Sequence, residues 1–194
     1  LVADPPSREH LRFRCVLSGN GPRELLYWDR RGLGSVRLFS TEELEASYGP
    51  DKLGPDALTI SGDELRERLG PSRRALKVAL LDQRAVAGIG NLYAAEILHA
   101  GQIHPARRCD KMSRADWHRL ADEMHDVLES AIRYEGSTLG DGTYRNALNE
   151  SGGYQHQHRV YDREGKPCPR CGTPIERIVQ GQRSTYFCPE CQRK

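Results

Sequence analysis

The chain has 194 residues, with 29 Lys and Arg, 27 Asp and Glu, and a formal net charge of +2 at pH 7. This length allows one or two ordinary domains, and no apolar stretch is long enough to span a membrane. The only methionines, Met112 and Met124, lie far from Leu1, so we expect the sequence to be part of a longer protein. Paired CxxC cysteines alongside the unpaired Cys15 and Cys109 favour a reducing, cytoplasmic compartment over secretion.

The N-terminal stretch predicts a small antiparallel sheet. Apolar side chains alternate along residues 11–17, which is the period of a half-buried strand. Two further short strands are expected at 24–28 and 35–39, and the loop 29–34 exposes two arginines beside an apolar side chain. Three strands with free edges do not make a whole domain. We therefore interpret residues 1–39 as the last part of a larger sheet domain.

The pattern changes to helices at Ser40. Capping boxes, in which a serine and a glutamate three residues later bond each other's backbone, mark helix starts at Ser40 and Ser61. Apolar residues spaced three and four apart predict further helices over 73–84, 91–100 and 113–135. A helical domain is therefore expected to follow the sheet.

The linker 87–91, Ala-Gly-Ile-Gly-Asn, joins two of these helices. Its glycines allow close backbone approach, and Asn91 is expected to cap the next helix, whose open N–H groups would suit a phosphate. Taken alone, the loop fits a plain glycine turn between packed helices better than a binding site.

Four cysteines near the C-terminus form two CxxC pairs, Cys168 with Cys171 and Cys188 with Cys191, separated by 16 residues. This doubled pattern predicts one tetrahedral zinc site with Zn–S bonds of about 2.3 Å. Four protein ligands leave no open position for water or substrate, so we expect structural zinc. Two disulfides, or a redox-active pair, are the alternatives that this spacing disfavours.

Residues 173–187, between the two cysteine pairs, predict a β-hairpin whose turn presents Arg183. So short a hairpin has almost no apolar core, and the metal must therefore provide its folding free energy. From Gly152 onward the chain has 8 Lys and Arg against 4 acidic residues, an excess of four positive charges. Such an excess suits a phosphate backbone, and a solvated basic surface is the open alternative.

Taken in this order, these motifs resemble the formamidopyrimidine-DNA glycosylase and endonuclease VIII family of base-excision repair enzymes. The resemblance covers nearly the whole chain. It rests on the zinc finger and six further motifs: Asp29-x-Arg31-x-Leu33-Gly34, Lys77 with Leu80-Leu81-Asp82-Gln83, Gly88-Ile89-Gly90-Asn91-Leu92-Tyr93-Ala94-Ala95-Glu96, Ile103-His104-Pro105, Gly136-Ser137-Thr138-Leu139 and Val160-Tyr161-Asp162-Arg163-Glu164-Gly165.

The resemblance implies an α+β fold in three parts. Residues 1–39 would be the C-terminal part of an N-terminal antiparallel β-sandwich. Residues 40–151 would form a helix-two-turns-helix DNA-binding domain, and residues 152–194 a zinc finger built on a β-hairpin. DNA would lie in the cleft between the halves.

Three residues would contact phosphates around the lesion. The resemblance implies that Lys77 lines the DNA cleft and that Asn91 anchors a phosphate next to the damaged nucleotide. Arg183 would grip the flanking phosphates and act as the proton donor of the second elimination step. A lone lysine on a helix is usually solvated, and only the Lys-x-x-Leu-Leu-Asp-Gln context of Lys77 favours the functional role.

Other residues would act at the flipped nucleotide. Arg31 would fill the space that the nucleotide leaves, and Leu33 would wedge between bases where the family's commonest sequence has phenylalanine. His10 would contact a phosphate, although a histidine at a strand edge is commonplace. Residues 146–158 would include the loop that closes over the flipped base.

The function implied is that of a bifunctional DNA glycosylase and AP lyase that removes oxidised purines such as 8-oxoguanine and formamidopyrimidines. The partner would be damaged double-stranded DNA, the cofactor structural zinc, and the location the cytoplasm and bacterial nucleoid, with no membrane and no obligate protein partner. The family's nucleophile is an N-terminal proline amine, followed by a glutamate and, further on, a lysine. None of these lies in this sequence, so we expect the chain alone to bind DNA without catalysis.

Two other classes remain open at this point. The first is a catalytically inactive, lesion-specific or structure-specific DNA-binding protein of the same fold. The second and more distant class is an RNA-binding or ribosome-associated protein with a helix-two-turns-helix domain. The four-cysteine hairpin with Gly-Gln-Arg-Ser-Thr at 181–185 argues against that second class.

Overall fold

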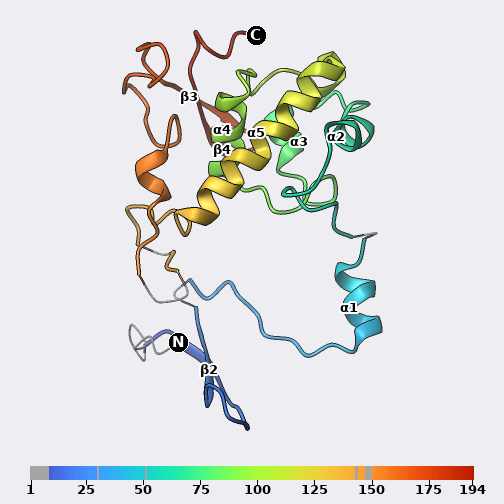
Figure 1. Ribbon diagram of the computed structural model, residues 1–194, viewed down its shortest axis with the longest axis vertical. Helices are drawn as coiled ribbons and strands as arrows, with labels where there is room; N and C mark the ends of the chain where they lie inside the picture. The colour runs from blue at the N-terminus through green and yellow to red at the C-terminus, as the bar shows by residue number, and fades with distance from the viewer. Residues whose placement is uncertain (1–8, 30, 51, 143, 147–149) are drawn as a thin grey trace.

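The computed structural model describes residues 9–29, 31–50, 52–142, 144–146 and 150–194. These parts contain helices and two separate antiparallel hairpins, which confirms the α+β class (Figure 1). The strands are β1 (Leu11–Val16), β2 (Glu24–Trp28), β3 (Glu176–Gln180) and β4 (Arg183–Phe187). The helices are α1 (Thr41–Tyr48), α2 (Gly62–Leu69), α3 (Leu76–Leu80), α4 (Asn91–Ala100) and α5 (Arg114–Arg133), with short 3-10 turns at Cys109–Lys111 and Tyr154–Gln157. Within the described segments, no helix combines the length and apolar composition that crossing a bilayer requires.

The N-terminal hairpin pairs β1 with β2, from Leu11 opposite Trp28 onward. Both strands were expected, but the third strand at 35–39 is wrong, because this stretch has no regular secondary structure. A strand needs a hydrogen-bonded neighbour, and residues 35–39 run away from the hairpin toward α1 (Figure 1). Val36 and Leu38 are therefore 54% and 98% exposed.

Capping boxes start three helices, with hydrogen bonds in both directions between side chain and backbone: Ser40 with Glu43, Ser61 with Glu64, and Ser113 with Asp116. α5 ends in a Schellman motif, in which the Gly136 N–H donates to the Ala131 carbonyl at 2.8 Å. The left-handed residue of this motif is Glu135, with a φ of 55°, and Gly136 follows with a φ of 78°. The helix therefore ends at Arg133, three residues before the glycine that was expected to end it.

α3 is shorter than the helix expected over 73–84 and has 5 residues. The backbone that precedes it pairs with a distant segment instead. Ala75 forms an antiparallel bridge with Arg108, and the Leu76 N–H donates to the Arg107 carbonyl at 2.8 Å. These tertiary hydrogen bonds satisfy the first N–H groups and fix where α3 begins, which local periodicity could not reveal.

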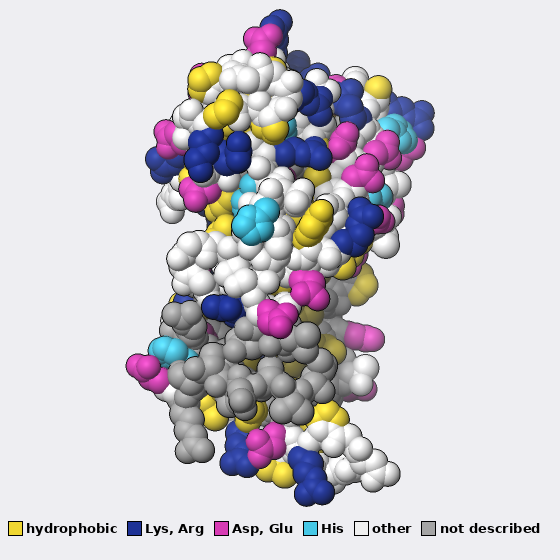
Figure 2. Space-filling model, turned by 60° about the vertical axis from the view of Figure 1, so that its left-hand side comes forward, with side chains coloured by type: hydrophobic (Ala, Val, Ile, Leu, Met, Phe, Trp, Pro, Cys, Tyr) yellow, Lys and Arg dark blue, Asp and Glu magenta, His cyan; other side chains and the backbone are white. Residues whose placement is uncertain are grey.

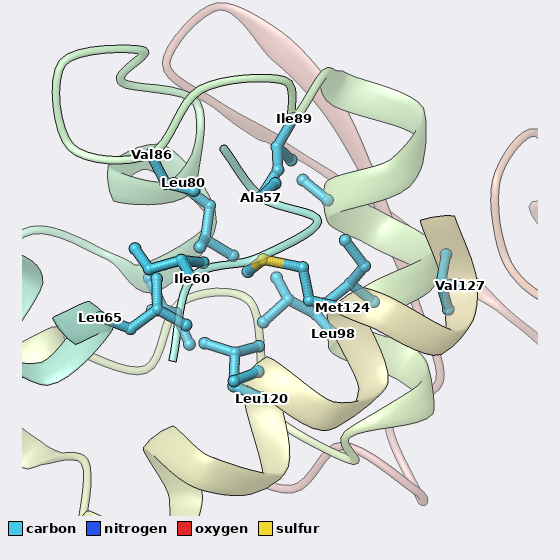
Figure 3. Close-up of a cluster of buried hydrophobic side chains, with 14 of the residues drawn as sticks. Ala57, Ile60, Leu65, Leu80, Val86, Ile89, Leu98, Leu120, Met124 and Val127 are labelled. Carbon is cyan, nitrogen blue, oxygen red and sulfur yellow. The ribbon is translucent and has the colours of Figure 1, made fainter. Parts of the chain in front are cut away.

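One apolar core holds the helical part together (Figure 3). α2 and α4 both pack on α5, and the side chains of Leu98, Leu120 and Met124 meet between them. All three side chains are fully buried. Each contributes about 1.5–3 kcal/mol by its removal from water. This core fixes α4, whose N-terminal end carries part of the candidate site.

The hairpin expected between the cysteine pairs is confirmed as β3 and β4. Its two-residue turn consists of Gly181 and Gln182, with left-handed φ values of 53° and 62°. Such turns match the twist of a hairpin. A second, smaller apolar cluster lies beneath it and joins the finger to α4: Ala95, Val160, Cys168, Ile175 and Cys188.

Candidate nucleic-acid interface and zinc site

Lys77 is a fully buried cation on α3. Its Nζ donates to Asn91 Oδ1 at 2.6 Å and lies 3.5 Å from the Ser184 carbonyl oxygen. Within the described segments no carboxylate pairs with it, and its hydrogen-bond partners there are an amide and a carbonyl. Burial, together with the nearby Arg183 guanidinium, lowers the pKa of Lys77 to about 8. A buried charge without a counter-charge is typical of a site for an anionic ligand.

Asn91 is the first residue of α4 and not its cap. The N-cap is Gly90, which has no side chain to accept a hydrogen bond. The Asn91 amide instead donates to the Ser184 carbonyl at 3.1 Å and accepts from Lys77, so it joins α3, α4 and β4. The first turn of α4 therefore lacks a side-chain cap, an arrangement that suits a phosphate.

The two glycines before α4 have different roles. Gly88 has a left-handed φ of 100°, which a side chain would strain. Gly90 faces open space, since a methyl group there would meet no atom of the described structure within 4 Å. The backbone at Gly90 is thus open to close approach by a ligand.

Arg183 begins β4, opposite Gln180, and its side chain is exposed. The hairpin tip rests on α3, because a methyl group at Gly181 would lie 3.8 Å from Val78. This docking brings Arg183 close enough to Lys77 to depress the pKa of that lysine. The structure therefore gathers Lys77, Asn91 and Arg183, which the sequence places far apart.

Lys and Arg side chains also gather on the surface at this level. Figure 2 shows them, with acidic side chains interspersed, over the upper part of the molecule, where Figure 1 draws β3 and β4. The mixture resembles an ordinary charged surface. The specific feature is therefore the buried lysine, rather than the overall charge.

The four cysteine sulfurs form one cluster. All lie within 4.8 Å of one another, with Cys168 and Cys191 at 3.9 Å and Cys171 and Cys188 at 3.4 Å. A tetrahedral ZnS₄ site with 2.3 Å bonds requires sulfurs about 3.8 Å apart, so this donor set fits zinc. Hydrogen bonds from Thr173 lower the pKa of the Cys171 thiol to about 6, while burial raises that of Cys188. Metal coordination deprotonates such thiols outright, and the cluster is a structural zinc site.

Two buried polar side chains fasten the finger to the helices, and no role for either was predicted from the sequence. Glu96 of α4 accepts the backbone N–H groups of Arg159, Val160 and Tyr161 at 2.8, 3.0 and 2.8 Å. Gln192 accepts the Cys188 N–H at 2.8 Å, and its amide donates to the Ile103 carbonyl at 2.9 Å, which links the zinc site to the helices. A glutamate inside the apolar run Ala94 to Ala100 was the available signal.

Arg31 and Leu33 lie on a loop organised by Asp29. Its carboxylate accepts the N–H groups of Arg31, Gly32 and Gly34 at 3.1, 2.8 and 2.7 Å. Hydrogen bonds from Gly34 and the neighbouring backbone lower the pKa of Asp29. The loop holds both side chains exposed, with Leu33 at 74%.

The N-terminal candidates do not join the others. Figure 1 draws the hairpin of β1 and β2 apart from the helices and finger. The backbone of the loop that carries Arg31 and Leu33 bonds to Asp29, whereas Lys77 bonds to Asn91 and Ser184. His10 lies half-buried beside β1, where its carbonyl accepts the Asp29 N–H at 3.0 Å. Residues 147–149 of the expected base-covering loop lie outside the described residues.

Comparison with known proteins agrees with this geometry. Residues 51–142 match the family described as formamidopyrimidine-DNA glycosylase H2TH domain, and residues 165–193 match the zinc finger found in FPG and IleRS. A formamidopyrimidine-DNA glycosylase of Chloroflexus aurantiacus is 40% identical over 195 residues, which cover 99% of this chain and 68% of that protein.

Solved structures give the same result. The MutM (Fpg) protein of Thermus thermophilus superposes with a TM-score of 0.83 at 38% identity, covering 98% of this chain and 71% of that one. MutM in complex with carbocyclic 8-oxo-G containing DNA gives a TM-score of 0.84 at 32% identity, covering 98% of this chain and 68% of that one. The chain belongs to the formamidopyrimidine-DNA glycosylase family.

Proposed function

We propose that this chain recognises oxidised purines in duplex DNA and serves base-excision repair as a member of a DNA glycosylase and AP lyase family. The observation that carries this proposal is Lys77, a buried cation held by neutral groups from α4 and the zinc finger. A phosphate diester would complete that arrangement, because it brings the missing negative charge. A relative solved with 8-oxo-G containing DNA supports the choice of lesion.

Lys77, Asn91 and Arg183 contact phosphates in this proposal. Lys77 and Arg183 supply charge, and the Asn91 amide fixes the position of the phosphate at the start of α4. By the family resemblance, Arg183 also donates the proton of the second elimination step. Its exposure on a hairpin fixed by zinc and by α3 suits both tasks.

A second group of residues acts at the flipped nucleotide and comes from the N-terminal part of the chain: Arg31, Leu33 and His10. Leu33 wedges between bases at the unstacked site, and Arg31 occupies the space of the flipped nucleotide. The Asp29 carboxylate holds this loop in shape, so both side chains are presented together. His10 contacts a phosphate of the DNA backbone.

The domain boundaries and location follow the same proposal. Residues 1–39 belong to the sheet domain, 40–151 to the helix-two-turns-helix domain and 152–194 to the finger. The protein acts on DNA in the bacterial nucleoid, without an obligate protein partner. A binding-only role is less favoured, because the similar proteins are named as glycosylases.

The phosphate role of Arg183 can be tested by salt dependence. Arg183→Ala should weaken binding to a duplex with one 8-oxoguanine and lower the slope of log K against log salt by about 0.9, the value for one lost phosphate contact. The zinc content should stay unchanged. An unchanged salt slope would remove Arg183 from the phosphate contacts.

Arg68→Ala is the matched control. Arg68 is an exposed arginine on α2, which Figure 1 draws apart from the hairpin of β3 and β4. The variant loses the same charge, so it should reproduce only the small, non-specific part of the effect. Equal losses in both variants would mean that net charge alone explains binding.

Borohydride trapping on the 8-oxoguanine duplex tests the catalytic part. A covalent band would show that an amine within residues 1–194 attacks C1′ of the flipped nucleoside and forms a Schiff base. If no band forms, residues 1–194 contribute DNA binding without the nucleophile. The salt dependence of Arg183→Ala then tests that binding separately.

A further inference from the structure

His99 is a buried imidazole at the C-terminal end of α4 that faces the zinc site. It is 1% exposed, and its Nε2 lies 3.4 Å from Sγ of Cys168, which is itself 3% exposed. In the described part of the chain, no other side-chain nitrogen comes within hydrogen-bond distance of that sulfur. His99 is not one of the ligands, because the set of mutually close metal-binding atoms contains only the four cysteines.

The contact determines which ring nitrogen carries the hydrogen. A zinc-bound Cys168 is a thiolate, which accepts hydrogen bonds and has none to donate. Nε2 must therefore be the N–H nitrogen, since two lone pairs would otherwise face each other. Nδ1 has no hydrogen-bond partner among the described residues. With the hydrogen on Nε2, Nδ1 carries only a lone pair, so no buried N–H is left without an acceptor, which proteins rarely tolerate.

The zinc site needs such donors. A zinc ion with four thiolates has a net negative charge, and burying that charge is unfavourable unless N–H groups face the sulfurs. The Cys191 backbone N–H donates to Cys188 Sγ at 3.4 Å. The imidazole of His99 supplies the corresponding bond to Cys168 from outside the finger.

The same face of α4 reaches the finger along its whole length. Asn91, Ala95 and His99 recur every four residues and so lie on one side of the helix. Asn91 contacts the β4 backbone, Ala95 packs in the apolar cluster with Cys168, and His99 contacts the Cys168 sulfur. Zinc at one end of this face and the phosphate-binding candidates at the other are thus fixed to one rigid helix.

We propose that His99 is a positioning residue of the zinc site, which donates an N–H···S hydrogen bond to the Cys168 thiolate, slows zinc release and fastens the finger to α4. The inference concerns the metal site and does not depend on DNA binding. If the His99 variants keep their zinc as wild type does, the role of His99 fails and the proposed DNA binding is untouched. If DNA binding fails, the role of His99 at the zinc site is untouched.

Zinc release under excess 4-(2-pyridylazo)resorcinol, which binds zinc and reports it by absorbance, tests the proposal. The matched pair is His99→Gln and His99→Asn, because the Gln amide nitrogen reaches the position of Nε2 and the Asn amide nitrogen only that of Nδ1. His99→Asn and the apolar His99→Phe should release zinc roughly 10-fold faster than wild type, the lower end of the usual effect of outer-shell partners. His99→Gln should stay within about 3-fold, as expected when an outer-shell donor is kept.

His125→Phe is the control for loss of a helical histidine. His125 bonds the Ile60 carbonyl at 3.1 Å, on α5 and away from the cysteines, so its loss should not change zinc release. A wild-type release rate in His99→Phe would overturn the proposal. Equally fast release from His99→Gln and His99→Phe would also overturn it, because ring packing alone would then explain the effect.

A measurement on the unmodified protein covers the case in which variants do not fold. Nitrogen-15 spectra of histidine-labelled, zinc-loaded protein distinguish the two tautomers of His99. The Nε2–H tautomer is expected, and an Nδ1–H tautomer would overturn the proposal.

Discussion

The structure predicts how much stability the substitution Glu96→Gln removes. Its carboxylate is fully buried and accepts three backbone N–H groups, with Oε2 facing Arg159 and Oε1 facing Val160 and Tyr161. In Glu96→Gln the amide oxygen can keep two of these bonds, but the NH₂ group faces the third N–H and cannot accept from it. One lost bond to a charged acceptor corresponds to about 1.5–3 kcal/mol of unfolding free energy. For a chain of this size, that corresponds to a lower Tm by roughly 3–12 °C.

Thermal unfolding of zinc-loaded protein, followed by circular dichroism, measures this change. Glu129→Gln on the exposed face of α5 removes the same charge without a buried partner, and should change stability by less than about 0.5 kcal/mol. Glu96→Ala leaves all three N–H groups unsatisfied and should be less stable than Glu96→Gln. Equal melting temperatures for Glu96→Gln and Glu129→Gln would refute the assigned role of the three hydrogen bonds.

Three further predictions concern DNA binding and the metal. Because the pKa of Lys77 is lowered to about 8, its ammonium loses charge above that pH. DNA affinity should therefore fall between pH 7 and 9, about where this group titrates. It should fall less in Lys77→Arg, whose guanidinium stays charged. Equal pH dependence of DNA affinity in wild type and Lys77→Arg would contradict this. Removing zinc with EDTA should abolish DNA binding while most helical circular dichroism remains, because the apolar core of the helices is separate from the cluster around the cysteines; full binding by zinc-free protein would argue against it. Arg31→Ala and Leu33→Ala should weaken binding to lesion-containing duplex more than to intact duplex, and equal losses on both would exclude a role at the unstacked site.

Local signals in the sequence predicted much of this molecule. The capping boxes, the helix Asn91–Ala100 and the hairpin between the cysteine pairs depend on neighbouring residues, and all were confirmed. The expected strand at 35–39 was wrong, because this stretch has no strand beside it among the described residues. The helix expected over 73–84 is confirmed only as Leu76–Leu80, because the backbone before it pairs with a distant segment at Arg108. The cap expected at Asn91 was also wrong, since its side chain turns to Lys77 and Ser184 instead.

The sequence by itself determined the family, the four zinc ligands and the identity of the phosphate-binding candidates, because each depends on residue type and spacing within a short motif. Only the tertiary structure decided that Lys77 is buried, that Asn91 and Ser184 hold it, and that Glu96, His99 and Gln192 join the helices to the finger. The physical reason is that a hydrogen bond between buried groups is set by how two distant segments pack. Sequence spacing carries no direct record of that packing.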